Sequence, residues 1–241
     1  CWPWENHAWE RAFVRDARVF GVRTVGYQHT VVGNREWNYA AGTKPDGLAS
    51  LPESILTSGR EGADILIQFG IPCERLNVAG ALRGTQFKSF LQDPNGPVFV
   101  ALPFDADIAS QIVSAIRPLG AQGMCFLVKT HPMTPFSFIP SDGIAETKEP
   151  LERQGGVSVV LYAATTVGLE AALGGLPTLR FRPVGKVPAD TVPSELNVIT
   201  VNAADLAAEL RSPAYPTSVD TEHFLATPDY ALWQKILGTE S

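Results

Sequence analysis

Apolar runs that resemble strands alternate with segments of helical character over most of the chain. The second half shows this most clearly, because its strand-like runs are almost wholly apolar, as the central strands of a parallel sheet are. These runs are PVFVALPF (97–104), MCFLVKTHP (124–132), VSVVLYA (157–163), LPTLRFRP (176–183) and the weaker NVITV (197–201). Helices are predicted at 106–120, 165–175, 203–211 and 228–237, with a short helix or turn at 147–156. The alternation predicts an α/β fold whose parallel sheet is covered by helices on both faces.

The first half shows the same alternation with shorter elements. Residues 5–20 are predicted to form an amphipathic helix, because Trp9, Phe13, Ala17 and Phe20 recur at helical spacing. The other predicted elements are strands at 22–30, 54–59 and 74–84, a helix at 60–70 and a long surface loop at 31–47.

A turn-rich linker, LQDPNGP (91–97), separates the two halves. We therefore predict two Rossmann-like domains, the first in residues 1–90 and the second in residues 91–241. The first half is short for an independent domain, and the chain opens close to a helix without an initiator Met. We expect the first domain to be incomplete here and the chain to belong to a longer protein with other domains.

Composition narrows the possible function classes. The chain has 241 residues and a net charge of −6, with no Lys/Arg cluster longer than two residues, so nucleic acid is not an expected partner. No apolar run reaches the ~18–20 residues needed to cross a bilayer. Cys1, Cys73 and Cys125 lack the spacing of metal ligands, and no carboxylate cluster suggests a metal. We expect reduced thiols in a cytoplasmic protein and no metal site.

The phrase KTHP (129–132) places two cationic donors at the end of a predicted strand. Ligands of open α/β sheets bind beyond the carboxyl ends of the strands. Lys129 and His131 are two residues apart, so on a strand their side chains point the same way and both can donate to one phosphate. The alternative is that His131 has only a structural role.

A second strand end, followed by a predicted helix, lies in YAATTVGLEAALGG (162–175). Thr165 or Thr166 is a natural N-cap, and the first N–H groups of the helix favour an anion. Glu170 lies one turn further, where a carboxylate accepts hydrogen bonds from ribose hydroxyls. The alternative is a simple cap with a solvated Glu170. A third strand end carries RFRP (180–183).

The first half offers Glu5, His7 and His29 as acid–base groups. Glu5 and His7 precede or begin the predicted first helix, and His29 follows a strand. A carboxylate or imidazole facing a cleft from there would remove a proton from an acceptor hydroxyl. The alternatives are a carboxylate that only favours the helix N-terminus and a histidine hydrogen-bonded within a loop.

Five phrases occur in an order that resembles a known enzyme group. They are ENHAWER (5–11), GYQHT (26–30), ILTSGREGADILIQFGIPCERLNVAGALR (55–83), KTHP (129–132) and YAATTVGLEAALGGLP (162–177). Together they resemble bacterial surface-polysaccharide glycosyltransferases of GT-B architecture, which have two facing Rossmann-like domains. The most similar are users of CMP-sugars, such as Kdo transferases and polysialyltransferases, and CDP-glycerol glycerophosphotransferases share the layout.

This resemblance implies roles for the residues above. His131 would bind the CMP phosphate with Lys129 beside it, Thr165 and Thr166 would bind phosphate, and Glu170 would bind ribose. The expected reaction moves Kdo or another nonulosonate from a CMP-sugar, a substrate and not a cofactor, to a lipopolysaccharide or capsule glycan. It would take place in the cytoplasm or at the cytoplasmic face of the inner membrane, without a metal.

The chain also departs from the pattern of that group. The acidic motif of the sialyltransferases is absent, so the catalytic base is not carried over, and Glu5, His29 and His131 stay as catalytic candidates. Ala164 stands where a second hydroxyl is often found. Two alternatives to the transferase remain open: a nucleotide-sugar epimerase on the same fold, and a non-catalytic module that binds a glycan or a protein.

Overall fold

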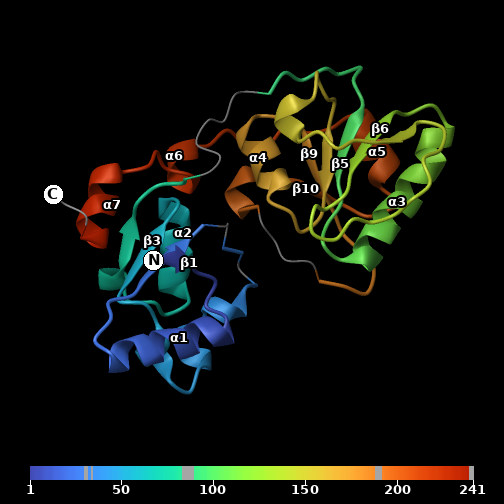
Figure 1. The fold of residues 1–241 in the computed structure, drawn as a ribbon. Coiled ribbons are helices and arrows are strands. Elements are labelled where there is room, and N and C mark those ends of the chain that lie inside the picture. Colours follow the sequence, from blue (N-terminus) through green and yellow to red (C-terminus); the bar gives the residue numbers. More distant parts are fainter. Residues whose placement is uncertain (30–31, 34, 83–89, 188–191, 239–241) are drawn as a thin grey trace. The chain divides into compact units, whose positions relative to one another are not determined.

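The computed structural model describes residues 1–29, 32–33, 35–82, 90–187 and 192–238. It divides into two compact units (Figure 1), Cys1–Gln86 with Asp220–Ser241 and Phe87–Val219. Each unit contains one sheet whose strand pairs are all parallel, which confirms the predicted α/β class. None of the helices in these ranges is both long enough and apolar enough to cross a membrane.

The first unit has a four-stranded sheet of order β1-β2-β3-β4. Its strands are β1 (Trp2–Pro3), β2 (Val25–Gln28), β3 (Ser54–Thr57) and β4 (Leu76–Val78). Its helices are α1 (Ala8–Val19), α2 (Arg60–Gln68), α6 (Thr221–Phe224) and α7 (Tyr230–Leu237), with short 3-10 turns η1 (Trp37–Tyr39), η2 (Ala41–Thr43), η3 (Gly47–Ser50) and η4 (Cys73–Arg75). The turns bring Tyr39 and Ala41 into the core beside Ile55 and Leu66, so the predicted surface loop is partly buried.

The C-terminal segment packs on the first unit, which corrects the predicted second-domain boundary of 91–241. Trp233 of α7 meets the Tyr27 ring edge-on at 5.0 Å, and its Nε1 donates to the Ala79 carbonyl at 2.9 Å. Ile236 joins the same buried cluster. The apolar face of α7 thus packs on residues of β2 and β3 of the first sheet, a long-range contact that local pattern cannot reveal.

The second unit has a six-stranded sheet of order β10-β9-β8-β5-β6-β7. Its strands are β5 (Val98–Ala101), β6 (Phe126–Lys129), β7 (Ile144–Glu146), β8 (Val160–Tyr162), β9 (Thr178–Phe181) and β10 (Ile199–Val201). Its helices are α3 (Ala106–Ala121), α4 (Val167–Leu173) and α5 (Leu206–Arg211), with 3-10 turns η5 (Leu151–Arg153) and η6 (Ser194–Leu196). Counted from β5, the order reads 3-2-1-4-5-6 across the sheet, the Rossmann order, and the direction of winding reverses between β5 and β8.

Alternation along each strand separates the two faces of this sheet. One face contributes Val100, Val128, Leu161 and Phe181 to the core beneath α3 and α5. The other face carries Tyr162, against whose ring α4 packs so closely that a Cβ on Gly168 would lie 2.4 Å away. Lys129 and Arg180 lie level with Tyr162 in the register, so their side chains share the α4 face.

Candidate functional site

The carboxyl edge of the second sheet is the candidate site, because the winding reverses there between β5 and β8. Register aligns Lys129, Ala101, Tyr162 and Arg180 in one row across β6, β5, β8 and β9. His131 and Arg182 follow two residues after Lys129 and Arg180, just beyond the ends of β6 and β9. The structure thus brings the KTHP, TTVGLE and RFRP segments to one edge.

His131 presents a free donor at this edge. Its Nδ1 accepts a hydrogen bond from the Met133 backbone N–H at 3.3 Å, which assigns the ring proton of the neutral imidazole to Nε2. The ring stands edge-on to Phe104 at 5.8 Å, and within the described ranges Nε2 has no partner. Lys129 is engaged differently, because its Nζ donates to the Lys148 carbonyl at 2.9 Å.

The turn from β8 into α4 holds an unusual backbone conformation. Ala164 has φ +49°, in the left-handed region that L-residues seldom adopt. Thr165 Oγ1 accepts from the Val167 N–H at 3.1 Å, so Thr165 and not Thr166 supplies the side-chain cap. Thr166 is exposed at the start of the helix with no capping bond from its side chain.

Glu170 is a half-buried carboxyl group one turn into α4. Burial, with a smaller contribution from the charge of Glu152, raises the pKa of Glu170 to about 7. It makes no side-chain hydrogen bond to the described residues. A partly dehydrated carboxylate without partners gains from a ligand that donates hydrogen bonds to it.

Arg182 is a cation that the sequence analysis did not assign, although it marked the RFRP segment. Arg180 is engaged, since its Nε donates to Tyr162 Oη and its Nη2 to the Val192 carbonyl, both at 3.0 Å. The Arg182 N–H donates to the Val201 carbonyl, which continues the hydrogen-bond ladder between β9 and β10. Arg182 is therefore still extended, and its side chain shares the α4 face with that of Arg180, two residues earlier. Arg182 is exposed, and its guanidinium has no partner in the described part of the chain.

The N-terminus of α3, at the same edge, already has an anionic partner in Asp105. Asp105 caps that helix by accepting from the Asp107 and Ile108 N–H groups at 2.9 and 3.1 Å. Lys186 lies 2.6 Å from Asp105 and holds the pKa of that carboxyl below its usual range. Among the described residues, His131, the α4 start and Arg182 remain available for an anion at this edge.

Glu5 and His29 lie at the carboxyl edge of the first sheet. The β1–β2 register pairs Pro3 with Tyr27, which places Glu5 level with His29. Glu5 Oε2 lies 2.8 Å from His7 Nε2, and the Glu5 side chain is 40% exposed. His29 Nδ1 is buried without a partner in the described residues.

Two further glutamates, missed in the sequence, shape this edge. Glu10 is buried and accepts from Trp2 Nε1 and from the N–H groups of Glu5 and His7, which fixes the turn that carries Glu5. Glu36 is half-buried. Burial is the main reason that the pKa of Glu36 is raised. A hydrogen bond from the Gly33 N–H lowers the pKa in part, and the charge of Glu5 raises it further. Glu5, His7 and Glu36 thus form a small acid–base group.

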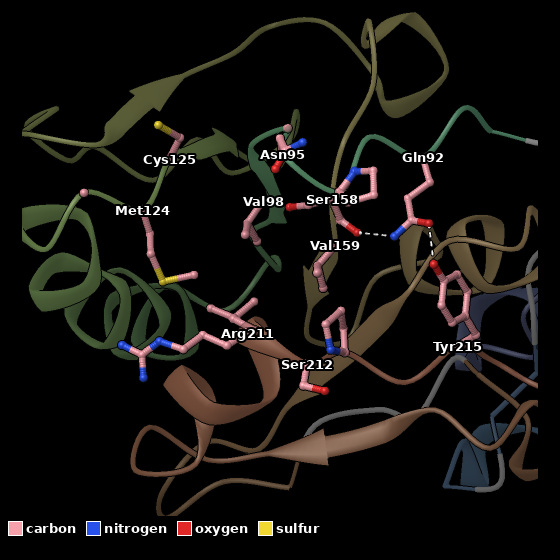
Figure 2. A pocket seen from close by; sticks show the side chains of 15 residues that line it. Gln92, Asn95, Val98, Met124, Cys125, Ser158, Val159, Arg211, Ser212 and Tyr215 are labelled. Atoms are coloured by element: carbon pink, nitrogen blue, oxygen red, sulfur yellow. Dashed lines mark hydrogen bonds between the residues drawn. The ribbon is translucent and has the colours of Figure 1, made fainter.

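A pocket of about 440 Å³ lies at the opposite, amino edge of the second sheet. Figure 2 shows Tyr215 donating to Gln92, which in turn donates to the Ser158 carbonyl, at 2.5 and 3.3 Å. Arg211 and Cys125 lie on other walls of the pocket. Its position at the amino ends of the strands separates it from the candidate site.

No protein-family model matches the sequence, and no curated protein matches it in sequence. Several solved structures match the fold. UDP-GlcNAc 2-epimerase from Neisseria meningitidis, bound to UDP-GlcNAc, aligns with TM-score 0.57 and 12% identity over 95% of this chain and 73% of that chain. UDP-GlcNAc 2-epimerase from Methanocaldococcus jannaschii, in complex with UDP-GlcNAc and UDP, aligns with TM-score 0.55 and 13% identity over 96% of this chain and 73% of that chain.

A third match is Anabaena Alr3699/HepE in complex with UDP-glucose, with TM-score 0.53 and 11% identity over 95% of this chain and 75% of that chain. At such identities the likeness concerns the fold alone. This chain has the parallel-sheet, Rossmann-like α/β units found in GT-B-like nucleotide-sugar proteins.

Proposed function

We propose that the protein is an enzyme acting on a nucleotide sugar, whose nucleotide part binds at the carboxyl edge of the second sheet. The observation that carries this is the set of polar groups at the strand ends on both sides of the β5–β8 reversal. His131, the α4 start and Arg182 face one edge there, and a partly buried carboxylate lies one turn behind them.

Each group has a distinct role in the proposal. His131 Nε2–H and the Arg182 guanidinium donate to phosphate oxygens from the ends of β6 and β9, strands that are three strand spacings or about 14 Å apart in the sheet. Thr165 and Thr166 hold the phosphate over the start of α4, and Lys129 adds positive charge behind His131. Glu170 accepts from the ribose hydroxyls.

The chemistry favoured by the comparisons is epimerisation of a nucleoside-diphosphate sugar. The solved structures named above include UDP-GlcNAc 2-epimerases with bound uridine nucleotides, which supports this reading. Inverting a carbon centre requires acid and base groups around the sugar ring. Glu5, with His7 and Glu36, is the candidate group, and His29 and His131 are the other catalytic candidates.

A second candidate is the transfer of a sugar from a CMP donor to a glycan. KTHP and YAATTVGLEAALGGLP favour it, because both phrases resemble motifs of CMP-sugar transferases. The CMP donor, the Kdo group and the lipopolysaccharide or capsule acceptor rest on that resemblance alone. Incubation with UDP-GlcNAc followed by NMR separates the classes, since an epimerase forms an epimer with no acceptor present.

Calorimetric titration tests the nucleotide site. We expect UDP to bind, and His131→Ala or Arg182→Gln to weaken its binding by about 10- to 100-fold each, because each removes one charge-assisted hydrogen bond of about 1.5–3 kcal/mol. Arg211→Gln is the matched control, since Arg211 is also an exposed arginine but lies at the amino edge. The affinities for CDP and CMP then show whether the site prefers uracil or cytosine and one phosphate or two.

Alkylation of Cys125 tests independently where the ligand binds. Cys125 is exposed in the amino-edge pocket, so UDP bound at the carboxyl edge should leave its reaction with iodoacetamide unchanged, as followed by peptide mass spectrometry. Equal UDP affinity in the parent, His131→Ala and Arg182→Gln proteins would overturn the proposal. So would protection of Cys125 by UDP.

A further inference from the structure

The amino-edge pocket of the second unit takes no part in the proposed nucleotide site. Its volume of about 440 Å³ lies within the range of small-molecule sites. The residues that line it all lie between positions 92 and 215, whereas both ends of the chain belong to the first unit. The pocket is therefore formed within one compact unit, and its walls do not include the ends of the chain.

Tyr215 forms one wall of the pocket as an exposed aromatic residue with a fixed orientation. It is 62% exposed, although its hydroxyl donates to Gln92 Oε1 at 2.5 Å. Gln92 is itself held, because its Nε2 donates to the Ser158 carbonyl at 3.3 Å and its backbone forms a bridge with Val157. Figure 2 shows the hydrogen bonds that hold this ring. A ring positioned before a ligand arrives loses little conformational freedom on binding.

Four other polar side chains line the pocket without a hydrogen bond to the described residues. They are the Asn95 carboxamide, the Ser158 and Ser212 hydroxyls and the Arg211 guanidinium. Asn95 is presented by a turn in which Asp93 Oδ1 accepts from the Asn95 N–H at 2.9 Å. The buried Val98 and Val159 add apolar lining. The pocket thus combines an exposed aromatic ring, apolar lining and several unused hydrogen-bonding groups.

We propose that this pocket binds a saccharide that carries a carboxylate group. A sugar ring presents C–H groups on its faces and hydroxyls around its edge, so it needs an aromatic surface with hydrogen-bonding groups beside it. Tyr215 supplies the surface, and the amide and hydroxyl groups of the lining both donate and accept. Arg211 is the one charged residue among the described lining residues, and its guanidinium pairs with a carboxylate.

Two other ligand classes fit the pocket less well. A cation finds no anionic partner, because the described lining residues include no carboxylate. A compact apolar molecule needs most of its surface buried. Asn95, Arg211 and Tyr215 are exposed, so the pocket is open along these walls. A saccharide keeps part of its hydroxyl surface in water and therefore suits an open site.

Calorimetric titration with two tetrasaccharides tests the proposal. We expect hyaluronan tetrasaccharide, which contains glucuronate, to bind at least ~10-fold more tightly than chitotetraose, which has no carboxylate, because only the former pairs with Arg211. Arg211→Gln should remove this preference. Arg153→Gln should not, since Arg153 is also an exposed arginine of the second unit but does not line the pocket.

The contribution of the aromatic ring is tested separately. Tyr215→Ala should weaken binding of hyaluronan tetrasaccharide at least ~10-fold, as loss of an aromatic contact residue does. Tyr215→Phe keeps the ring and should bind within a few-fold of the parent protein. Tyr230→Ala is the matched control, since Tyr230 is 66% exposed but belongs to α7 of the first unit. Should Tyr215→Ala unfold, the exposed Arg211→Gln variant keeps the test decisive.

Protection of Cys125 then locates the bound saccharide. Cys125 is exposed and lines the same pocket, so hyaluronan tetrasaccharide should slow its reaction with iodoacetamide, whereas UDP should not. Absence of binding, or equal affinities for the two tetrasaccharides in the parent protein, would overturn the proposal. So would an unchanged alkylation rate at saturating tetrasaccharide, or equal effects of Tyr215→Ala and Tyr230→Ala.

Discussion

At pH 8 the Glu170→Gln variant should unfold at a higher temperature than the parent protein, and at pH 4 the two should unfold together. The reason is the environment of Glu170, which is half-buried on α4 without a hydrogen-bond partner in the described residues. Desolvation, followed by the charge of Glu152, raises the pKa of Glu170 from 4.5 to about 7. Gln resembles the protonated acid and carries no charge at either pH.

The direction of this pH dependence follows from the difference in proton binding between the folded and the unfolded chain. Below pH 4.5 the carboxyl is protonated in both the folded and the unfolded chain. Between 4.5 and about 7 the folded chain holds the proton and the unfolded chain does not, so the free energy of unfolding falls as pH rises. Above 7 the loss of stability is complete, at about 3 kcal/mol, which corresponds to a fall in melting temperature of about 6–12 °C for a chain of this size.

The same group links pH to nucleotide binding. A carboxylate accepts hydrogen bonds from ribose hydroxyls more strongly than the protonated acid does, so the affinity for UDP should increase as pH rises through 7. A 2′,3′-dideoxy analogue of UDP should not show this increase. Glu146→Gln, at an exposed carboxylate of β7, is the control for a simple loss of charge. Parallel pH curves for parent and Glu170→Gln proteins would contradict the argument.

The core of the fold could be predicted because parallel strands are buried on both faces and therefore leave an apolar pattern. β5, β6, β8 and β9 all lie within their predicted runs. β1 and β7 were missed, because two or three residues are too few to show a period and their pairing depends on distant strands. The helix predicted at 5–20 begins only at Ala8, since Glu10 holds residues 5–7 in a turn.

The strand ends could be predicted as a candidate site for a similar reason. Parallel strands bring all their carboxyl ends to one edge, so KTHP, TTVGLE and RFRP had to gather once the sheet was known. What required coordinates was the state of each side chain. Only the hydrogen bonds show that Lys129 Nζ donates to the Lys148 carbonyl and that the Arg180 guanidinium donates to Tyr162. The Arg182 guanidinium makes no such bond to the described residues.

The second large effect is expected at Glu5. Glu5→Gln should reduce turnover at least ~100-fold, the low end for losing a positioned acid or base, whichever of the two candidate reactions the product assay identifies. Glu5 lies at the carboxyl edge of the first sheet, 2.8 Å from His7 and level with His29. Burial, with a smaller contribution from the charge of Glu5, raises the pKa of Glu36.

Folding and UDP affinity should be nearly unchanged in this variant, because the contacts that hold the turn use the Glu5 backbone. Its N–H donates to Glu10, and its carbonyl accepts from Asn38 Nδ2 at 2.6 Å. If Glu5 only forms a surface pair with His7, worth about 0–1 kcal/mol, Glu5→Gln should lower the melting temperature slightly and keep turnover within a few-fold. Glu61→Gln is the matched control, since Glu61 forms another carboxylate–histidine pair in this unit, 3.1 Å from His223. Near-normal turnover in Glu5→Gln would remove Glu5 from the mechanism and leave His29, whose buried Nδ1 has no partner in the described residues, as the next base to test.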